Sequence, residues 1–284
     1  VNEGVFRIAG DSVLPVRESV SGDYSAVCLY QWIRNPNVVV VGLMDGLALL
    51  RRTPEGWIDE GRMPDLGLDV WTIAEGIMGE LWLGSQASGL ACIRIPEIEK
   101  GEGIEVDKIE VTLYGQEAGL DNGTLRPFCI GHKVYFAGPG ELIYSFDEPT
   151  GRFFIDPLFE GATSGHILGN FQMREDSEGR VWIASTYGAP VIAHPQADGT
   201  YSFEILRQFL RKRIIDIYPE SDGIAWLMGE DELIRYEVIS AQGAEAILPP
   251  LIRQVQVSGT DLLYGGAGKP TAAEVEYRSG AIRF

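Results

Sequence analysis

Cysteine, histidine and basic side chains are scarce in this sequence of 284 residues. Its 23 basic against 41 acidic side chains give a formal net charge of −18. A surface this acidic repels nucleic acid and anionic lipid, which excludes both as partners. Three cysteines, an odd number without a CxxC motif, argue against a disulfide framework and against a zinc or redox site. Each cysteine lies in an alternating apolar stretch, so we expect buried thiols at Cys28, Cys92 and Cys129.

Long apolar runs and enzyme motifs are also missing. The longest apolar run, near residues 38–50, is interrupted by Asp45 and is too short to span a bilayer. The sequence has no HExxH or GxSxG motif. The segment GGAGKPT (265–271) fails as a phosphate-binding loop because Pro270 stands where a Ser or Thr would bind magnesium. The histidines are too scattered for a metal triad, so the sequence predicts no catalytic site, no metal and no cofactor.

Glycine, by contrast, is abundant, with 35 residues, and it recurs in a repeated pattern. A turn, a short strand with one aromatic residue and then a small residue appear four times, with a weaker fifth copy at 35–42 that has Val39 in the aromatic place. The aromatic positions are Trp82, Tyr135, Trp182 and Trp226. Alternating apolar strands flank every copy, and the spacing of 43–53 residues fits one four-stranded propeller blade.

The repeats therefore predict an all-β fold, a β-propeller of four-stranded antiparallel blades. We expect the propeller at residues 1–246 and the beginning of a β-sandwich at 247–284. The expected blades are a partial one at 2–16 and five full ones near 26–62, 69–115, 127–160, 170–206 and 214–246. We expect the tryptophans to pack between sheets.

Segments 69–95, 170–194 and 214–238, with their shared Gly-x-x-Trp spacing, resemble the repeats of two-component regulator propellers. Two other copies depart from the motif, with His132 and Pro36 where glycine is expected. The PPLIRQVQVSG segment that begins at 249 resembles the start of the triple-tyrosine domain, an immunoglobulin-like sandwich that follows the propeller in such sensors. About 36 residues of it are present, against ~100 for an immunoglobulin-like domain.

The resemblance implies a periplasmic or otherwise extracytoplasmic sensor region of a membrane receptor, which passes ligand binding on to a kinase or cyclase outside this sequence. It implies a small polar ligand such as an oligosaccharide, a dimeric receptor and no enzymatic activity in this region. Two alternatives stay open. A propeller lyase or hydrolase predicts a cluster of His, Glu or Tyr side chains, and a protein-binding scaffold predicts an exposed apolar patch.

Propeller geometry locates the expected ligand site. The loop before the first strand of each blade, and the turn between its second and third strands, open on the same mouth of the central channel. Polar and aromatic side chains that converge there suit a small polar ligand. The candidate ligand-binding residues are Tyr24, Asp45, Asp69, Gln86, Arg126, His166, Tyr187 and Arg213.

Overall fold

The computed structural model describes most of the chain. The described residues are 4–18, 24–63, 66–86, 89–96, 103–163, 167–220, 223–238, 254–257, 261–265 and 282–283. They divide into two compact units, Val1–Val238 and Ile239–Phe284. His166 lies outside the described residues, and for Tyr187 only the backbone is described.

The first unit is built from antiparallel sheets whose strands follow one another in chain order. A two-stranded sheet contains β1 (Gly4–Ala9) and β2 (Ser12–Glu18). The four-stranded sheets contain β3 (Ala26–Gln31), β4 (Val38–Leu43), β5 (Gly46–Thr53) and β6 (Gly56–Met63); β7 (Thr72–Glu75), β8 (Leu81–Gly84), β9 (Leu90–Arg94) and β10 (Glu110–Tyr114); β11 (Arg126–Ile130), β12 (Lys133–Ala137), β13 (Ile143–Asp147) and β14 (Arg152–Ile155); and β15 (Ile167–Glu175), β16 (Val181–Gly188), β17 (Val191–Pro195) and β18 (Tyr201–Ile205). A three-stranded sheet contains β19 (Ile214–Pro219), β20 (Ile224–Gly229) and β21 (Leu233–Glu237).

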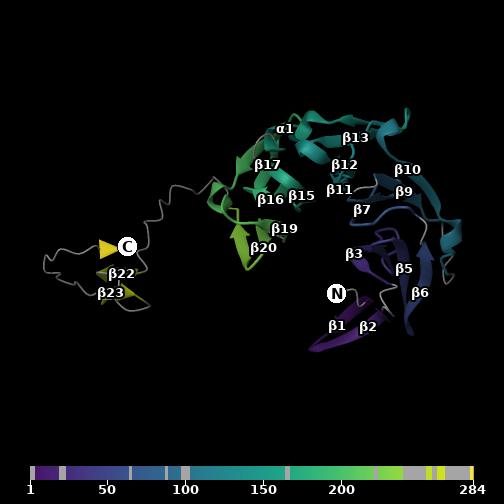
Figure 1. Ribbon diagram of the computed structural model, residues 1–284, viewed down its shortest axis with the longest axis horizontal. Coiled ribbons are helices and arrows are strands. Elements are labelled where there is room, and N and C mark those ends of the chain that lie inside the picture. Colours follow the sequence, from purple (N-terminus) through teal and green to yellow (C-terminus); the bar gives the residue numbers. More distant parts are fainter. Residues whose placement is uncertain are drawn as a thin grey trace. The chain divides into compact units, whose positions relative to one another are not determined.

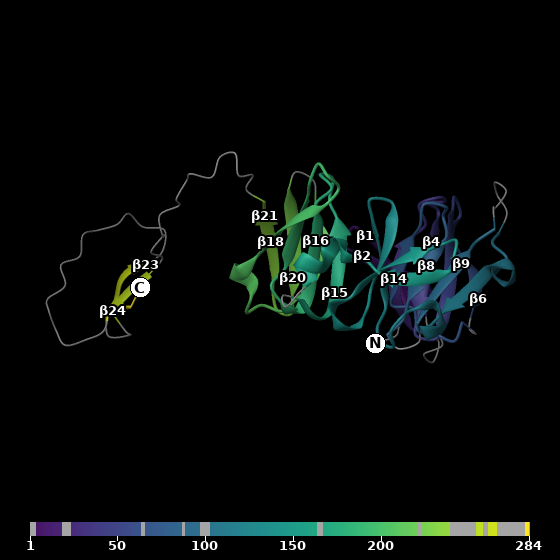
Figure 2. The same cartoon turned by 90° about the horizontal axis from the view of Figure 1, so that it is seen from above.

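Within this unit the first strand of each of the last five sheets, β3, β7, β11, β15 and β19, lies nearest the common centre, and the later strands lie further out (Figure 1). The same succession of sheets is visible from above in Figure 2. Short 3₁₀ turns and the helix α1 (Glu160–Thr163) lie in the connections. This arrangement is a β-propeller and confirms the predicted fold class. The last sheet has three strands among the described residues, where the sequence predicted four.

Neighbouring sheets pack face to face because strand residues alternate between the two sides of a sheet. Trp82 packs toward the following sheet, against Phe136 and Phe153, as predicted. Trp182 does the same against Ile217. In the first four-stranded sheet, however, the corresponding residue is Val40 and not the predicted Val39. The register places Val40 in the core shared with the following sheet, whereas Val39 packs toward β1 and β2.

Two kinds of hydrogen bond repeat between sheets. At one end the chain entering a sheet donates to the previous one, from Val70 N to Leu43 O at 2.9 Å and from Leu125 N to Ser85 O at 3.0 Å. At the other end a glutamate that ends a first strand accepts from the hairpin of the previous sheet. The backbone N–H of Ile33 donates to Glu75 at 2.8 Å, and that of Gly131 donates to Glu175 at 2.7 Å.

The close approach of successive sheets explains why one position is small in every four-stranded sheet. Two residues after the Val40, Trp82, Tyr135 and Trp182 positions stand Gly42, Gly84, Ala137 and Ala184, whereas the last sheet has Met228, which is 47% exposed. A Cβ on Gly84 would lie 2.4 Å from Leu125 O.

We therefore expect Gly84→Val to destabilise the propeller by about 2–3 kcal/mol, because the added side chain must push the next sheet away. Met228→Val at the corresponding position of the last sheet should change stability by less than about 0.5 kcal/mol. Urea denaturation of both variants measures this difference. Equal losses would contradict the packing explanation.

The hairpins between first and second strands carry the glycines of the repeat. Gly79, Gly179 and Gly223 adopt φ angles of 81°, 76° and 76°, which residues with a Cβ rarely adopt. His132 has a φ of 68° in the corresponding hairpin, so it occupies the left-handed conformation that glycine supplies elsewhere.

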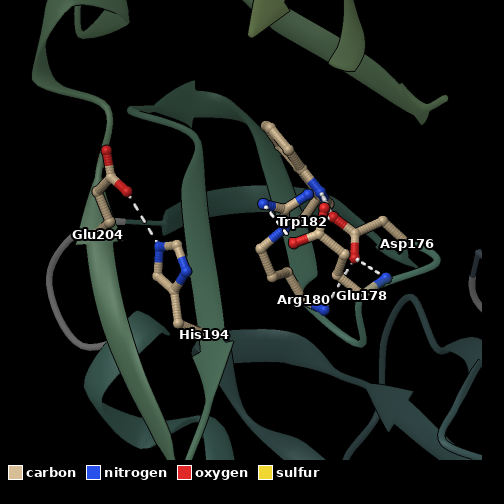
Figure 3. Close-up of polar contacts among 6 residues, drawn as sticks. All are labelled: Asp176, Glu178, Arg180, Trp182, His194 and Glu204. Carbon is tan, nitrogen blue, oxygen red and sulfur yellow. Dashed lines mark hydrogen bonds and ion pairs between the residues drawn. The ribbon is translucent and has the colours of Figure 1, made fainter. Parts of the chain in front are cut away.

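The hairpin between β15 and β16 is held by a buried carboxylate (Figure 3). One oxygen of Asp176 accepts from Arg180 Nε at 2.7 Å and from Trp182 Nε1 at 2.9 Å. The other accepts from the backbone N–H groups of Glu178 and Arg180 at 3.0 and 2.9 Å. This carboxylate therefore ties the hairpin to the tryptophan of its own sheet, and its role is structural.

The second unit contains the antiparallel sheet of β22 (Gln254–Val257), β23 (Asp261–Gly265) and β24 (Ile282–Arg283), with β22 in the centre. These strands fall within the segment predicted to begin a sandwich. The remaining residues of 247–284, on which the triple-tyrosine resemblance also depends, lie outside the described residues.

Candidate functional site

The first strands of the five sheets line a cavity of about 410 Å³, which we call the channel cavity. Its volume lies in the range of small-molecule sites. The cavity is lined by Tyr30, Ile73, Ala74, Pro127, Phe128, Cys129, Met173, Arg174, Glu175, Tyr218 and Pro219.

The strand register explains why these residues meet. In each sheet one residue of the first strand pairs with the repeat position of the second strand, which is Val40, Trp82, Tyr135, Trp182 or Trp226. These paired residues form one level that contains one residue from every first strand. Its members are Tyr30, Ala74, Phe128, Arg174 and Tyr218. Two tyrosines and an arginine at one level give the cavity both ring faces and a hydrogen-bond donor.

Arg174 supplies a positive charge to the channel cavity. Its guanidinium lies 3.3 Å from the Asp216 carboxylate on the neighbouring first strand, and the two side chains are 47% and 36% exposed. An ion pair this exposed contributes about 0–1 kcal/mol to stability, so its groups can turn to a ligand at little cost. Tyr218 is 65% exposed and leaves its ring open to contact.

Of the two glutamates that accept hydrogen bonds from preceding sheets, Glu175 lines the channel cavity and Glu75 does not. Glu175 is exposed beside it, whereas Glu75 is buried beneath Tyr30 and accepts from the Tyr30 hydroxyl at 3.4 Å. Burial and the nearby Glu75 charge raise the pKa of Tyr30, so this phenol stays protonated and acts as a donor.

Cys129 corrects the prediction of three buried thiols. Cys92 is buried and Cys28 is partly buried, but Cys129 is exposed because its strand borders the channel cavity. Desolvation raises the pKa of all three thiols, to about 12 for Cys28 and about 11 for Cys92. The thiols therefore remain protonated at neutral pH, which makes them poor nucleophiles.

Three predicted mouth residues lie in polar contacts just before first strands or in turns. Asp45 pairs with Arg62 at 2.7 Å, and Arg213 pairs with Glu230. Asp69 accepts from Trp71 Nε1 at 2.6 Å and from Ser85 Oγ at 2.5 Å, which fixes its carboxylate in place.

Gln86 and Arg126 lie between the second and third of these five sheets. Gln86 is exposed, and its backbone carbonyl accepts from Thr124 at 3.0 Å. Arg126 is half-buried, and its Nε has no hydrogen-bond acceptor among the described residues. Desolvation lowers the Arg126 pKa, against the opposing influence of Asp216. A partly desolvated guanidinium whose Nε lacks an acceptor among the described residues suits an anionic or hydroxyl-rich ligand.

Tyr24 lies in a different environment from the other predicted residues. Its side chain is fully buried among Val5, Val41 and Leu50, and the Arg17 guanidinium lies 5.1 Å from its ring centroid. Tyr24 therefore packs the two-stranded sheet against its neighbour, where it has no surface for a ligand. For the exposed candidate residues, ligand binding at the channel mouth stays a prediction.

The side chains on the first strands that line the channel cavity were not predicted from the sequence. Arg174 and Tyr218 stand eight residues ahead of the repeat tryptophans Trp182 and Trp226, but the predicted site used only loops. A comparison of the first strands with one another, at a fixed distance before each hairpin, is the signal that could have found them.

No family model matches the chain, and no curated protein matches it. Solved structures do resemble it. One is the extracellular domain of BT4673 from B. thetaiotaomicron, named as a hybrid two-component system, at 18% identity and a TM-score of 0.59, covering 84% of this chain and 30% of that one. Another is the extracellular domain of BT3049 from the same organism, with the same description, at 13% identity and a TM-score of 0.58, covering 98% of this chain and 35% of that one.

A third similar structure is virginiamycin B lyase from Staphylococcus aureus, at 12% identity and a TM-score of 0.51, covering 84% of this chain and 78% of the lyase. At these identities the likenesses establish the propeller fold. The chain spans about a third of the length of the two B. thetaiotaomicron domains. Within the described residues, no helix has the length and apolar character to cross a membrane, and no three His, Cys, Asp or Glu side chains gather as a metal site.

Proposed function

We propose that this propeller is an extracytoplasmic ligand-sensing module of a two-component type membrane receptor, and that it binds a glycan fragment or a similar polar nutrient. The channel cavity carries the proposal, because all five first strands contribute to one space of about 410 Å³ with exposed tyrosine and arginine side chains. The fold likeness to two extracellular domains named as hybrid two-component systems supports the receptor context.

Charge favours a neutral ligand. The net charge of −18 opposes the approach of polyanions, so affinity must come from hydroxyl groups and ring faces. Tyr218 offers an exposed ring, and Arg174 offers guanidinium donors. Neutral oligosaccharides have both the flat apolar faces and the hydroxyl acceptors that match these groups.

An enzyme is the second candidate, because virginiamycin B lyase shares the fold. The lining of the channel cavity favours binding over catalysis. Its thiol has a raised pKa, its tyrosine hydroxyl Tyr30 is held protonated, and its charged pair Arg174–Asp216 is exposed to solvent. General acid–base catalysis calls for groups with pKa values near the working pH.

A screen of neutral oligosaccharides by thermal shift, with chromatography of each mixture, tests the proposed function. We expect at least one oligosaccharide to raise the melting temperature while remaining chemically unchanged. With ligand at about 100 times its Kd, the gain in stability is about 2.7 kcal/mol. Formation of a product would support the lyase or hydrolase alternative instead, and no shift with any oligosaccharide would contradict glycan sensing.

A further inference from the structure

A second cavity, of about 220 Å³, lies between the β7–β8 hairpin and the following sheet. We call it the hairpin pocket. Its lining includes the aromatic side chains of Trp82, Phe136 and Phe146, whose rings pack edge to face with centroids 4.9 and 5.0 Å from that of Trp82. The pocket is at the hairpin end of the strands, whereas the predicted channel mouth is at their opposite end, and it shares no lining residue with the channel cavity.

The internal repeat shows what is unusual about this pocket. In the β15–β16 hairpin, Asp176 holds both Arg180 and Trp182 (Figure 3). The residues at the corresponding places in the β7–β8 hairpin are Gly76, Glu80 and Trp82. The tryptophan is kept, but a carboxylate stands where the other hairpin has its guanidinium.

Among the described residues, no basic side chain forms an ion pair with the Glu80 carboxylate. The residue is only 9% exposed, and its Oε2 is buried without a hydrogen-bond partner among the described residues. Its other oxygen lies directly over Gly76, since a Cβ built on that glycine would be 1.8 Å from it. An ionised carboxylate buried without a partner is costly, so the site favours the arrival of a positive charge.

The basic side chains of the lining are His132 and Lys133, and among the described residues neither forms an ion pair with Glu80; His132 is exposed. Lys133 places its ammonium 3.0 Å from Asp156 and 4.6 Å from the ring centroid of Tyr135, which faces the other side of the sheet. A second carboxylate, Glu148, lines the pocket and is exposed. The pocket therefore combines two carboxylates with an aromatic surface.

We propose that the hairpin pocket binds a small organic cation, an amidinium, guanidinium or ammonium group carried on an apolar body. Its charged head pairs with Glu80, in the role that Arg180 has within its own hairpin, and its body packs on Trp82, Phe146 and the exposed Ile77. The aromatic lining disfavours a divalent metal ion, which requires oxygen ligands on most sides.

Benzamidine and benzamide form a matched pair of probes, because they share shape and differ in charge. The whole chain is titrated with each probe, and tryptophan fluorescence and NMR monitor binding. We expect the Kd for benzamidine to be at least about tenfold lower than the Kd for benzamide. Equal affinities would overturn the proposal, since an apolar pocket alone would not distinguish the probes. Binding of Ca²⁺ in preference to benzamidine would also overturn it.

Two variants separate a ligand contact from a structural role. Glu80→Gln should weaken benzamidine binding at least about tenfold and should leave the melting temperature unchanged or raised, because it removes an unpaired buried charge. Glu110→Gln, an exposed carboxylate on β10, should change neither quantity. A lowered melting temperature with unchanged benzamidine affinity in Glu80→Gln would assign Glu80 a structural role and overturn the proposal. Oligosaccharide binding in the channel cavity should be the same in both variants.

Discussion

Replacement of Trp182 by alanine is expected to destabilise the propeller by about 3–5 kcal/mol, the usual cost of removing a buried tryptophan side chain. Trp182 is fully buried between two sheets, contacts Tyr236 edge to face at 6.0 Å between centroids, and donates from Nε1 to Asp176 at 2.9 Å. The variant loses this packing and leaves a buried carboxylate with one donor fewer. Urea denaturation followed by circular dichroism measures the loss.

Trp226 provides the matched control, because it occupies the same position of the repeat in the last sheet. Its side chain is half-buried, and its Nε1 donates to Glu220 at 3.2 Å in an exposed contact. We expect Trp226→Ala to cost no more than about 1 kcal/mol, as for a side chain with a small buried area. Equal losses at the two positions would show that packing between sheets is not what the repeated tryptophan contributes.

The second large effect is expected for Asp176→Asn. The Asp176 and Arg180 side chains are 2% and 9% exposed, so the substitution removes the buried counter-ion of the guanidinium and leaves only the exposed Glu178 carboxylate, 3.2 Å from Arg180 Nη1. Loss of one partner of a buried pair costs about 3–5 kcal/mol, and the remaining amide oxygen recovers a part of it, so we expect about 2–4 kcal/mol. Asp198→Asn, in an exposed turn that Thr200 closes in a similar way, should have little effect.

The pH dependence of stability gives Asp176 a separate signature. Burial alone would raise the Asp176 pKa, but the hydrogen bonds from Trp182 and Arg180 outweigh it and hold the pKa below its ordinary value. A carboxyl whose folded pKa is lowered stabilises the fold above its unfolded pKa, and this contribution is lost as the pH falls through the folded value. The wild type should therefore lose more stability than Asp176→Asn below about pH 4. Parallel acid titrations of the two proteins would contradict this assignment.

The repeated hairpins could be predicted from the sequence because their requirements are local. A left-handed turn needs glycine, and the strand that follows it places a tryptophan three residues later against a neighbouring sheet, as Gly79 and Gly179 show. The same requirement placed a hairpin at His132, where a histidine stands in the left-handed position that glycine has in the other copies. In the weak first copy the prediction was wrong by one residue, because it chose Val39 where the structure has Val40. Four successive valines have no periodicity that shows which of them faces which side of the sheet.

The candidate sites depended on contacts that sequence spacing does not show. Tyr24 has the composition of a binding residue and is nevertheless buried against the first hairpin. The channel cavity is lined by first strands of different sheets, whose residues are over 40 positions apart in the sequence. The ion pair of Arg174 with Asp216 is one example. The missing counter-charge of Glu80 becomes visible only when its hairpin is compared in space with that of Arg180.

Calorimetric titration of a neutral oligosaccharide into the wild type, Arg174→Met and Arg152→Met tests the central claim most directly. Arg174 borders the channel cavity and has an exposed partner, so its loss should leave the fold intact, and Arg152 is an exposed arginine on an outer strand. We predict saturable binding to the wild type and to Arg152→Met, with at least about tenfold weaker binding to Arg174→Met. Equal affinity in all three proteins, or cleavage of the oligosaccharide during the titration, would contradict a ligand-sensing channel.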